Sequence, residues 1–273
     1  MFRKIFASKG VGFIGPLLIL LFVFFNIPLL IMLGRSVSEP FVTFDHYVYL
    51  FNNPVYLKVM VNTLKIAILI TVLCMIIGYP FAYWMTTLKP KWQLAAVTVV
   101  VLSFLVSILV RVYAWIVLLG NNGVVNSLLL KLGWITQPLK IIYNSFGVNI
   151  GTLNVLLPFF ILPLYFSMLK IDQRLMKAAA SLGASPAQTF IRVYFPLTIP
   201  ALISSSILVF ILTLGFYITP AILGGGKVSM IANVLDLLIN QMSSWELASA
   251  LSVILLIVTI VFYYISRKAE VLK

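Results

Sequence analysis

The sequence predicts an all-α integral membrane protein with six transmembrane helices and both termini in the cytoplasm. Three observations lead to this prediction: an apolar composition, six long hydrophobic runs and an uneven distribution of Lys and Arg. Of the 273 residues, 62% are hydrophobic and 9% are charged, whereas soluble domains carry about 25% charged residues. Since hydrocarbon offers backbone amides no partners, the chain must cross it as helices or a closed barrel, and continuous apolar runs favour helices.

A helix needs about 20 consecutive apolar residues to cross a bilayer. Six runs reach this length, and we expect spans at residues 11–33, 66–86, 94–119, 151–169, 201–223 and 247–266. No linker rich in Ser or Gly and no internal repeat divides the sequence, so residues 1–273 are interpreted as a single transmembrane domain. The connecting segments at about 34–65 and 120–150 are expected to carry short interfacial helices.

The basic residues predict the orientation. With a cytoplasmic N-terminus, 12 of the 19 Lys and Arg residues fall on cytoplasmic segments: Arg3, Lys4, Lys9, Lys89, Lys91, Lys170, Arg174, Lys177, Arg192, Arg267, Lys268 and Lys273. Such a bias is typical of cytoplasmic loops in a multi-pass protein of the cell membrane. The net charge of +13 is scattered between apolar runs, so we expect membrane lipid around the chain and no nucleic-acid partner.

The segment between the fourth and fifth spans is longer than a bare connection requires. Asp172 can cap a helix that runs through the alanines at 178–180, and Gly183 suits the position just past its end. Ser185 and Pro186 can begin a second helix. The sequence therefore predicts a helix, a sharp turn and a helix on the cytoplasmic face. A solvated hairpin without a partner is the alternative that composition leaves open.

This segment resembles the cytoplasmic Glu-Ala-Ala signature of the inner-membrane components of binding-protein-dependent ABC importers. The chain matches the spacing of that signature without a gap at Ala178, Ala179, Gly183, Val193, Phe195 and Pro196. One residue departs from it: Lys177 stands where the family usually has glutamate. The resemblance implies a MetI-like ABC importer permease architecture in which a loop at about 170–200 couples to an ATPase. The implied coupling residues are Lys177, Ala178, Ala179, Gly183, Ala184, Ser185, Pro186, Phe190 and Pro196.

Three further segments, at 111–120, 157–164 and 220–225, look like the spermidine/putrescine branch of this family. The resemblance implies an inner-membrane importer of a polyamine, although permeases for phosphonates, opines and amino-acid-like solutes look similar. It also implies the partners: a second permease that is a homologue or a second copy, two ATPase subunits that bind ATP and Mg, and an extracytoplasmic solute-binding protein. This chain itself is then not an enzyme, and we expect it to carry no catalytic residue, metal or cofactor.

Arg111 is a candidate for the substrate pathway. It lies 17 residues beyond Leu94, which is about 26 Å along a continuous helix, so we expect it near the outer face of the membrane. Either its guanidinium snorkels or packs between helices, or it lines the pathway together with Tyr113 and Trp115.

Two acids, Asp236 and Glu246, are expected on the last outside segment. They could meet a cationic solute or the binding protein there, and ordinary solvated loop charges are the plainer alternative. Asn62 and Thr63 are expected to cap the second span.

Gly215 and Pro220 are expected either to bend the fifth span, where Pro would free a backbone carbonyl, or to mark its end.

An ion-coupled secondary transporter is the alternative function from another class. It would be expected to hold acids within the membrane. The six acids all fall in expected loops or the tail, at Glu39, Asp45, Asp172, Asp236, Glu246 and Glu270, which disfavours this class. A membrane enzyme is disfavoured because the sequence has one histidine, His46, in an expected loop, and one cysteine, Cys74, in an apolar run.

Overall fold

The computed structural model describes residues 9–38 and 42–271, and it describes side chains for residues 15–38 and 42–264. Four residues that entered the sequence predictions, Arg3, Lys4, Glu39 and Lys273, lie outside the described residues. The chain is divided into two compact units, one made of residues up to Leu57 together with Leu235–Ile257, the other made of Lys58–Val234 and the residues from Val258 onward.

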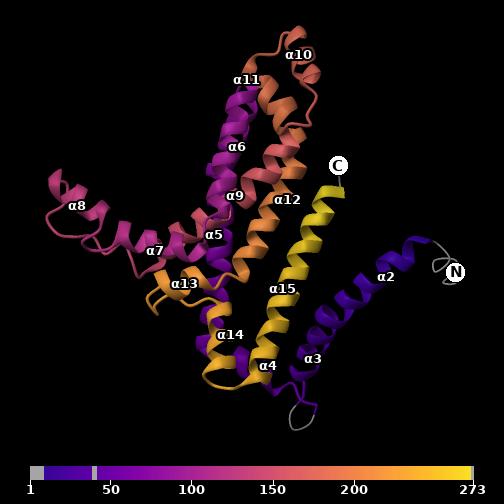
Figure 1. Cartoon of the computed structure of the whole chain (residues 1–273), viewed down its shortest axis with the longest axis vertical. Coiled ribbons are helices and arrows are strands. Elements are labelled where there is room, and N and C mark those ends of the chain that lie inside the picture. The colour runs from indigo at the N-terminus through magenta and orange to yellow at the C-terminus, as the bar shows by residue number, and fades with distance from the viewer. Residues whose placement is uncertain (1–8, 39–41, 272–273) are drawn as a thin grey trace. The chain divides into compact units, whose positions relative to one another are not determined.

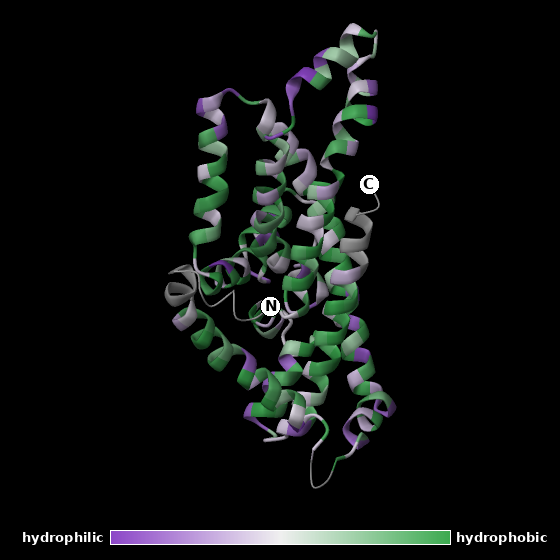
Figure 2. Cartoon of the chain, turned by 90° about the vertical axis from the view of Figure 1, so that its right-hand side faces the viewer, coloured by the Kyte–Doolittle hydropathy of each residue, from purple (hydrophilic) through white to green (hydrophobic). Residues whose placement is uncertain are grey.

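Among the described residues, six helical segments are long and apolar enough to cross a membrane: Gly15–Arg35, Pro54–Thr87, Ile108–Lys131, Ser145–Met168, Pro186–Leu214 and Trp245–Tyr264. Figure 2 shows hydrophobic residues along these helices and hydrophilic residues gathered at their ends and connections. The prediction of an all-helical protein with six spans is confirmed. The prediction of a single domain stays a prediction.

The named elements of the first unit are all helices. Its elements are α2 (Lys9–Leu21), the π-helix η1 (Phe22–Asn26), α3 (Ile27–Arg35), α4 (Asp45–Asn52), the first parts of α5 (Pro54–Thr87) and α15 (Trp245–Val271), and α14 (Ile231–Asn240) from Leu235 onward. Within this unit the guanidinium carbon of Arg35 lies 5.5 Å from the ring centroid of Trp245, at the end of the first span. Helix α4 is the expected short helix of this segment, and it contains His46, which the sequence had placed in a loop.

The second unit is built around α9. Its elements are the rest of α5, then α6 (Pro90–Leu105), α7 (Ile108–Leu119), α8 (Val124–Lys131), α9 (Ser145–Met168), α10 (Gln173–Ser181), α11 (Pro186–Thr189), η2 (Phe190–Tyr194), α12 (Phe195–Leu214), α13 (Ile218–Leu223) and the start of α14 (Ile231–Asn240). Half of the most apolar window of α9 is buried, and α12 packs along it (Figure 1).

Close approach between α5 and α9 depends on one small residue. A Cβ placed on Gly78 would lie 2.5 Å from Cδ1 of Phe160, whose side chain is fully buried in α9. Because a methyl group cannot occupy that space, Gly78 permits the ring of Phe160 to pack directly on the backbone of α5.

The expected third span, at residues 94–119, is wrong as a single continuous helix. Helix α6 ends at Leu105, and α7 begins at Ile108, because Val106 and Ser107 between them adopt extended ψ angles of 131° and 134°. Figure 1 shows α7 leaving α6 at a steep angle. The estimate that placed Arg111 about 26 Å along one helix therefore fails.

The fifth span also differs from the expected range of 201–223. It extends back to Pro186 and ends at Leu214, with Gly215 as its C-cap. Pro220 lies in the separate short helix α13. The two predicted alternatives were a bend in the fifth span and its end, and the structure shows the end, at Gly215.

The prediction that Asn62 and Thr63 cap the second span is wrong. Helix α5 begins eight residues earlier at Pro54, and the Oδ1 atom of Asn53 accepts a hydrogen bond from the amide of Val55 at 3.0 Å. A capping side chain followed by Pro at the first position is a strong helix start. The helix therefore begins at Pro54 and continues through Asn62.

Asn62 and Thr63 instead join α5 to a segment far away in the sequence. The Nδ2 atom of Asn62 donates to the carbonyl of Ser229 at 2.9 Å. The hydroxyl of Thr63 donates to the carbonyl of Val59 at 2.8 Å and accepts from the amide of Ile231 at 2.9 Å. The two side chains therefore hold the chain just before α14 against α5.

We predict that Thr63→Val destabilises the protein more than Thr71→Val does. Both threonines are buried in α5 and donate to a carbonyl four residues earlier, but only Thr63 also accepts a hydrogen bond from another segment. Leaving the buried amide of Ile231 without a partner should cost about 1–3 kcal/mol. Thermal unfolding of the two variants in detergent measures the difference, and equal losses would show that the link to Ile231 contributes nothing.

Candidate functional site

The predicted cytoplasmic segment forms two short helices joined by a turn, and we call residues 172–190 the elbow. The Oδ1 atom of Asp172 accepts a hydrogen bond from the amide of Arg174 at 2.9 Å and so caps α10. The carbonyl of Lys177 accepts a hydrogen bond from the hydroxyl of Ser181 at 3.0 Å. The local prediction of a capped helix through the alanines is confirmed.

Gly183 makes the turn of the elbow. Its φ angle is +82°, a left-handed conformation that glycine adopts without strain. The amide of Ala184 then bonds back to the carbonyl of Ala179 at 3.1 Å, which closes the end of α10. Any residue with a Cβ would be strained at Gly183, so the turn depends on this glycine.

The second helix of the elbow starts with a reciprocal cap. The hydroxyl of Ser185 accepts from the amide of Gln188 at 3.3 Å, and the side-chain oxygen of Gln188 accepts from the amide of Ser185 at 2.9 Å. Pro186 occupies the first position of α11. This helix runs through the π-helix η2 into α12, so the elbow is continuous with the fifth span.

The face of the elbow that points away from the aromatic cluster described below is exposed. Lys177 and Ala178 are exposed, and Leu182 at the tip has 89% of its surface exposed. Ala179 is half-buried. An exposed leucine next to small side chains and the exposed cations Arg174 and Lys177 forms a surface that another protein can approach closely, and Figure 1 shows the elbow at one end of the second unit.

The opposite face of the elbow packs on an aromatic cluster, which consists of Tyr79, Tyr83, Phe190, Tyr194 and Phe195. The ring centroid of Phe190 lies 5.0 Å from that of Tyr83 and 6.5 Å from that of Tyr79, and Tyr83 lies 5.1 Å from Tyr194. These are ordinary distances for edge-to-face aromatic pairs. The cluster connects the elbow to α5 and to α12 at once.

A cavity of about 710 Å³ lies between the elbow and the ends of α5 and α9. Ala184, Pro186 and Phe190 line it from the elbow, and Tyr83 and Thr86 line it from α5. The elbow is therefore not packed solidly against the spans. It touches them through the aromatic rings and leaves space beside them.

The start of α12 carries the last predicted coupling residue, Pro196. It lies in the first turn of that helix and is half-buried. Two residues later, the hydroxyl of Thr198 lies 3.0 Å from the hydroxyl of Tyr79. This hydrogen bond is a second link between α5 and α12 next to the elbow.

Sequence reasoning identified Phe190 but missed Tyr79, Tyr83 and Tyr194. A signal was present, because Tyr79 and Tyr83 are four residues apart, as are Phe190 and Tyr194. Residues at that spacing share one helix face. Two such aromatic pairs in separate helices could have been matched to each other.

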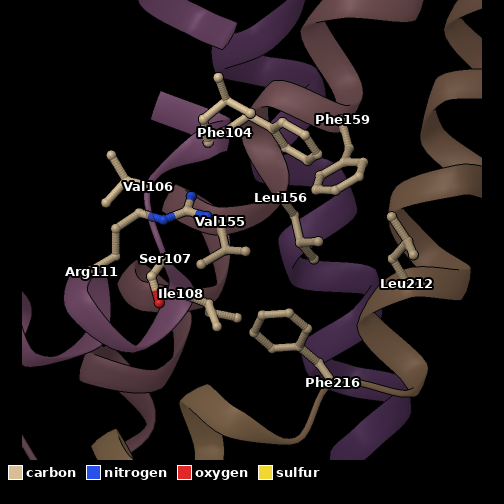
Figure 3. Close-up of a pocket in the computed structure, with 11 residues that line it drawn as sticks. Phe104, Val106, Ser107, Ile108, Arg111, Val155, Leu156, Phe159, Leu212 and Phe216 are labelled. Carbon is tan, nitrogen blue, oxygen red and sulfur yellow. The ribbon is translucent and has the colours of Figure 1, made fainter. Parts of the chain in front are cut away.

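Arg111 lies in the first turn of α7, beside the break between α6 and α7. A cavity of about 410 Å³ is bounded there by Ser107, Arg111 and nine apolar side chains: Phe104, Leu105, Val106, Ile108, Val155, Leu156, Phe159, Leu212 and Phe216. Figure 3 shows the guanidinium directed into this space, toward Val155. The Nε and Nη1 atoms of Arg111 are buried and have no hydrogen-bond partner.

Within the second unit, the other two predicted pathway residues do not gather around Arg111. The side chain of Tyr113 is 59% exposed, and Trp115 packs against the core of the second unit, but neither lines the cavity. Asp236 lies within α14, where its Oδ1 atom accepts from Asn240 at 2.7 Å, and Glu246 lies in the first turn of α15. Both acids were expected in a loop, and both belong to the first unit.

Within the part of the chain that the structure describes, no group of three or more His, Cys, Asp or Glu side chains could hold a metal ion. Cys74 is buried as a free thiol.

The sequence of this chain is similar to those of known permeases. The chain is 38% identical over 232 residues to the spermidine/putrescine transport system permease protein PotB of Haemophilus influenzae, covering 83% of this chain and 80% of that protein. It is 35% identical over 248 residues to the protein of the same name from Escherichia coli, covering 88% and 89%. The inner membrane ABC transporter permease protein YdcU of Escherichia coli is 33% identical over 63% of this chain and 59% of its own length.

Solved structures show the same fold. A bacterial ABC transporter in complex with an alginate-bound periplasmic protein contains a chain that matches with a TM-score of 0.71, at 18% identity over 95% of this chain and 94% of that one. A chain of the MetNI methionine ABC transporter, in an inward-facing conformation, matches with a TM-score of 0.60, at 13% identity over 80% and 97%. Residues 78–271 match the family described as binding-protein-dependent transport system inner membrane component. This chain is thus a multi-pass membrane permease that belongs to that family of ABC importer components.

Proposed function

We propose that this chain is the permease subunit of an ATP-driven importer for a polyamine such as spermidine or putrescine. The observation that carries the proposal is a sequence identity of 35–38% with two spermidine/putrescine transport system permeases, which extends over 83–88% of this chain. The importer would contain a second permease, two ATPase subunits that bind ATP and Mg, and an extracytoplasmic binding protein that delivers the solute. Hydrolysis of ATP belongs to the ATPase subunits.

The described part of the second unit offers a polyamine little charge to bind. Asp172 is its only carboxylate with a described side chain, and it caps α10 in the elbow. A solute that carries several ammonium groups would be recognised by carboxylates and aromatic rings. Selection of the solute is therefore assigned to the binding protein and to groups outside this unit, while the second unit supplies the moving wall of the pathway.

The elbow is the proposed point at which ATP hydrolysis acts on this chain. An ATPase that closes around Leu182 and the exposed alanines would push α10 and α11 together, since the turn at Gly183 and the caps at both sides hold them as one piece. The push would then reach α5 through Phe190 and Tyr83 and reach α12 through the continuous helix. A shift of this kind between two packed arrangements is a common form of switching.

The elbow must face the cytoplasm for this mechanism. With both termini in the cytoplasm, six spans place the connection between the fourth and fifth spans on that side, next to Lys170, Arg174, Lys177 and Arg192. The positive-inside rule supports this orientation.

The function is tested with the purified complex of this chain, its neighbouring permease, ATPase subunits and binding protein in proteoliposomes. We expect uptake of labelled spermidine or putrescine that requires ATP, and a raised melting temperature of the binding protein with the same polyamine, because a ligand stabilises the protein that binds it. Stabilisation by phosphonates, opines, sugars or inorganic anions alone would refute the polyamine assignment. Uptake by this chain alone, driven by an ion gradient, would refute the importer class.

We predict that Leu182→Asp uncouples the elbow from the ATPase. Because 89% of the side chain is exposed, the substitution leaves the fold intact, but it puts a charge where an apolar contact is proposed. Loss of one buried leucine contact corresponds to a drop in ATP-driven uptake of about tenfold or more. The matched control is Leu139→Asp, at a leucine that is 46% exposed and lies outside the elbow. Equal uptake by both variants would remove Leu182 from the contact.

We predict that Lys177 meets an acidic residue of the ATPase. The side chain is exposed, and exposed ion pairs are weak, so Lys177→Glu should lower uptake by no more than about fivefold. A reciprocal acid-to-Lys change in the ATPase should restore the loss. The prediction is measured as the ATP hydrolysed for each molecule taken up, and it is wrong if no acid-to-Lys change improves the Lys177→Glu complex.

A further inference from the structure

The charge of Arg111 is not neutralised within the described part of this chain. Its Nε and Nη1 atoms are buried without a hydrogen-bond partner. Among the described side chains of the same unit, the only carboxylate is that of Asp172, which caps α10. A guanidinium in apolar surroundings is strongly unfavourable unless a charged or hydrogen-bonding group faces it. The described part of this unit therefore supplies no partner for the charge of Arg111.

The cavity beside Arg111 has room for that group. Its volume is about 410 Å³, while a single water occupies about 30 Å³ in the liquid, so a complete side chain fits. The guanidinium presents parallel N–H donors that suit the two oxygens of a carboxylate. Ser107, the N-cap of α7, also lines the cavity and makes no capping bond with its side chain, so a second donor is available.

The surroundings of the cavity indicate where the carboxylate comes from. The proposed solute is a cation, which the guanidinium would repel. The residues that lead to the cavity are apolar and uncovered: Leu105 is 67% exposed and Val106 is 43% exposed. An apolar rim around one partly buried cation is the pattern of a protein contact in which an ion pair lies within apolar packing.

We propose that the Arg111 cavity receives a carboxylate side chain of the second permease subunit. This inference rests on the proposed function, because that subunit is part of the proposed importer. Arg111 then forms an ion pair across the contact between the two permeases, and Leu105 and Val106 pack around it. Phe104, Phe159 and Phe216 exclude water from the pair.

Cross-linking in the complete complex tests the position of the contact. Cys74 is the only cysteine of this chain, so Cys74→Ser provides a background in which Ser107→Cys is the single thiol. Cysteines are placed one at a time at each acidic position of a cysteine-free second permease, and the complex is oxidised with copper phenanthroline. The proposal requires that at least one acidic position cross-links to residue 107, and it is overturned if none does.

Charge exchange tests the ion pair itself, with polyamine uptake in proteoliposomes as the readout. Arg111→Gln and Arg111→Glu should lower uptake by about tenfold or more, since each leaves a buried carboxylate unpaired or facing another. An acid-to-Arg change at the cross-linked position should bring the Arg111→Glu complex back to within about threefold of the wild type. Arg35→Gln is the matched control, because Arg35 stacks on Trp245 in the other unit, and it should retain uptake.

The remaining outcomes are also decisive. If Arg111→Gln impairs uptake only in vesicles that contain phosphatidylglycerol, and not in pure phosphatidylcholine, then a lipid phosphate is the partner and the proposal is overturned. It is equally overturned if no acid-to-Arg change restores the Arg111→Glu complex. Failure of the proposed function is distinguishable, because the unmodified complex would then show no ATP-dependent polyamine uptake at all.

Discussion

Hydrocarbon gives a backbone amide nothing to bond with, and this constraint governs the whole chain. Wherever the chain leaves a helix, another group has to replace the lost hydrogen bonds. Asn62 and Thr63 do so for the segment before α14, through the carbonyl of Ser229 and the amide of Ile231. The elbow, outside the spans, uses Asp172, Ser185 and Gln188 for the same purpose. Side chains that look unremarkable in the sequence therefore hold the irregular parts in place.

Sequence alone could predict the helical class, the number of spans and the local form of the elbow, because hydropathy and capping residues act over short distances. It could not predict the break between α6 and α7, since Val106 and Ser107 are neither Pro nor Gly and only packing selects their extended form. The error at Asn62 and Thr63 has a related cause: both residues bond to a segment about 167 residues away. At the site, Phe190 was named among the coupling residues of the loop that the family resemblance implies, whereas its partners Tyr79 and Tyr83 required the pairing of α5 with η2.

The two candidate sites in the second unit differ in the chemistry that they offer. At the elbow, small and apolar side chains are exposed beside Arg174 and Lys177, so apolar shape contact together with weak exposed charges decides what can dock. At the Arg111 cavity, a partly buried cation is surrounded by aromatic and aliphatic groups, so charge decides what can bind. A permease that moves a cationic solute would gain from keeping its own unpaired cation away from that solute, and an ion pair with a neighbouring subunit achieves this.

The π-helix η2 lies between the elbow and α12, at Phe190–Tyr194. A π turn contains about one residue more than an α turn, so its conversion to α would rotate everything on one side of it by about 100° relative to the other. The aromatic cluster sits on that same turn and holds it against α5. A torque applied to the elbow would thus act on a turn that has two discrete hydrogen-bond patterns, π and α. Such a turn switches between two fixed orientations and does not bend continuously.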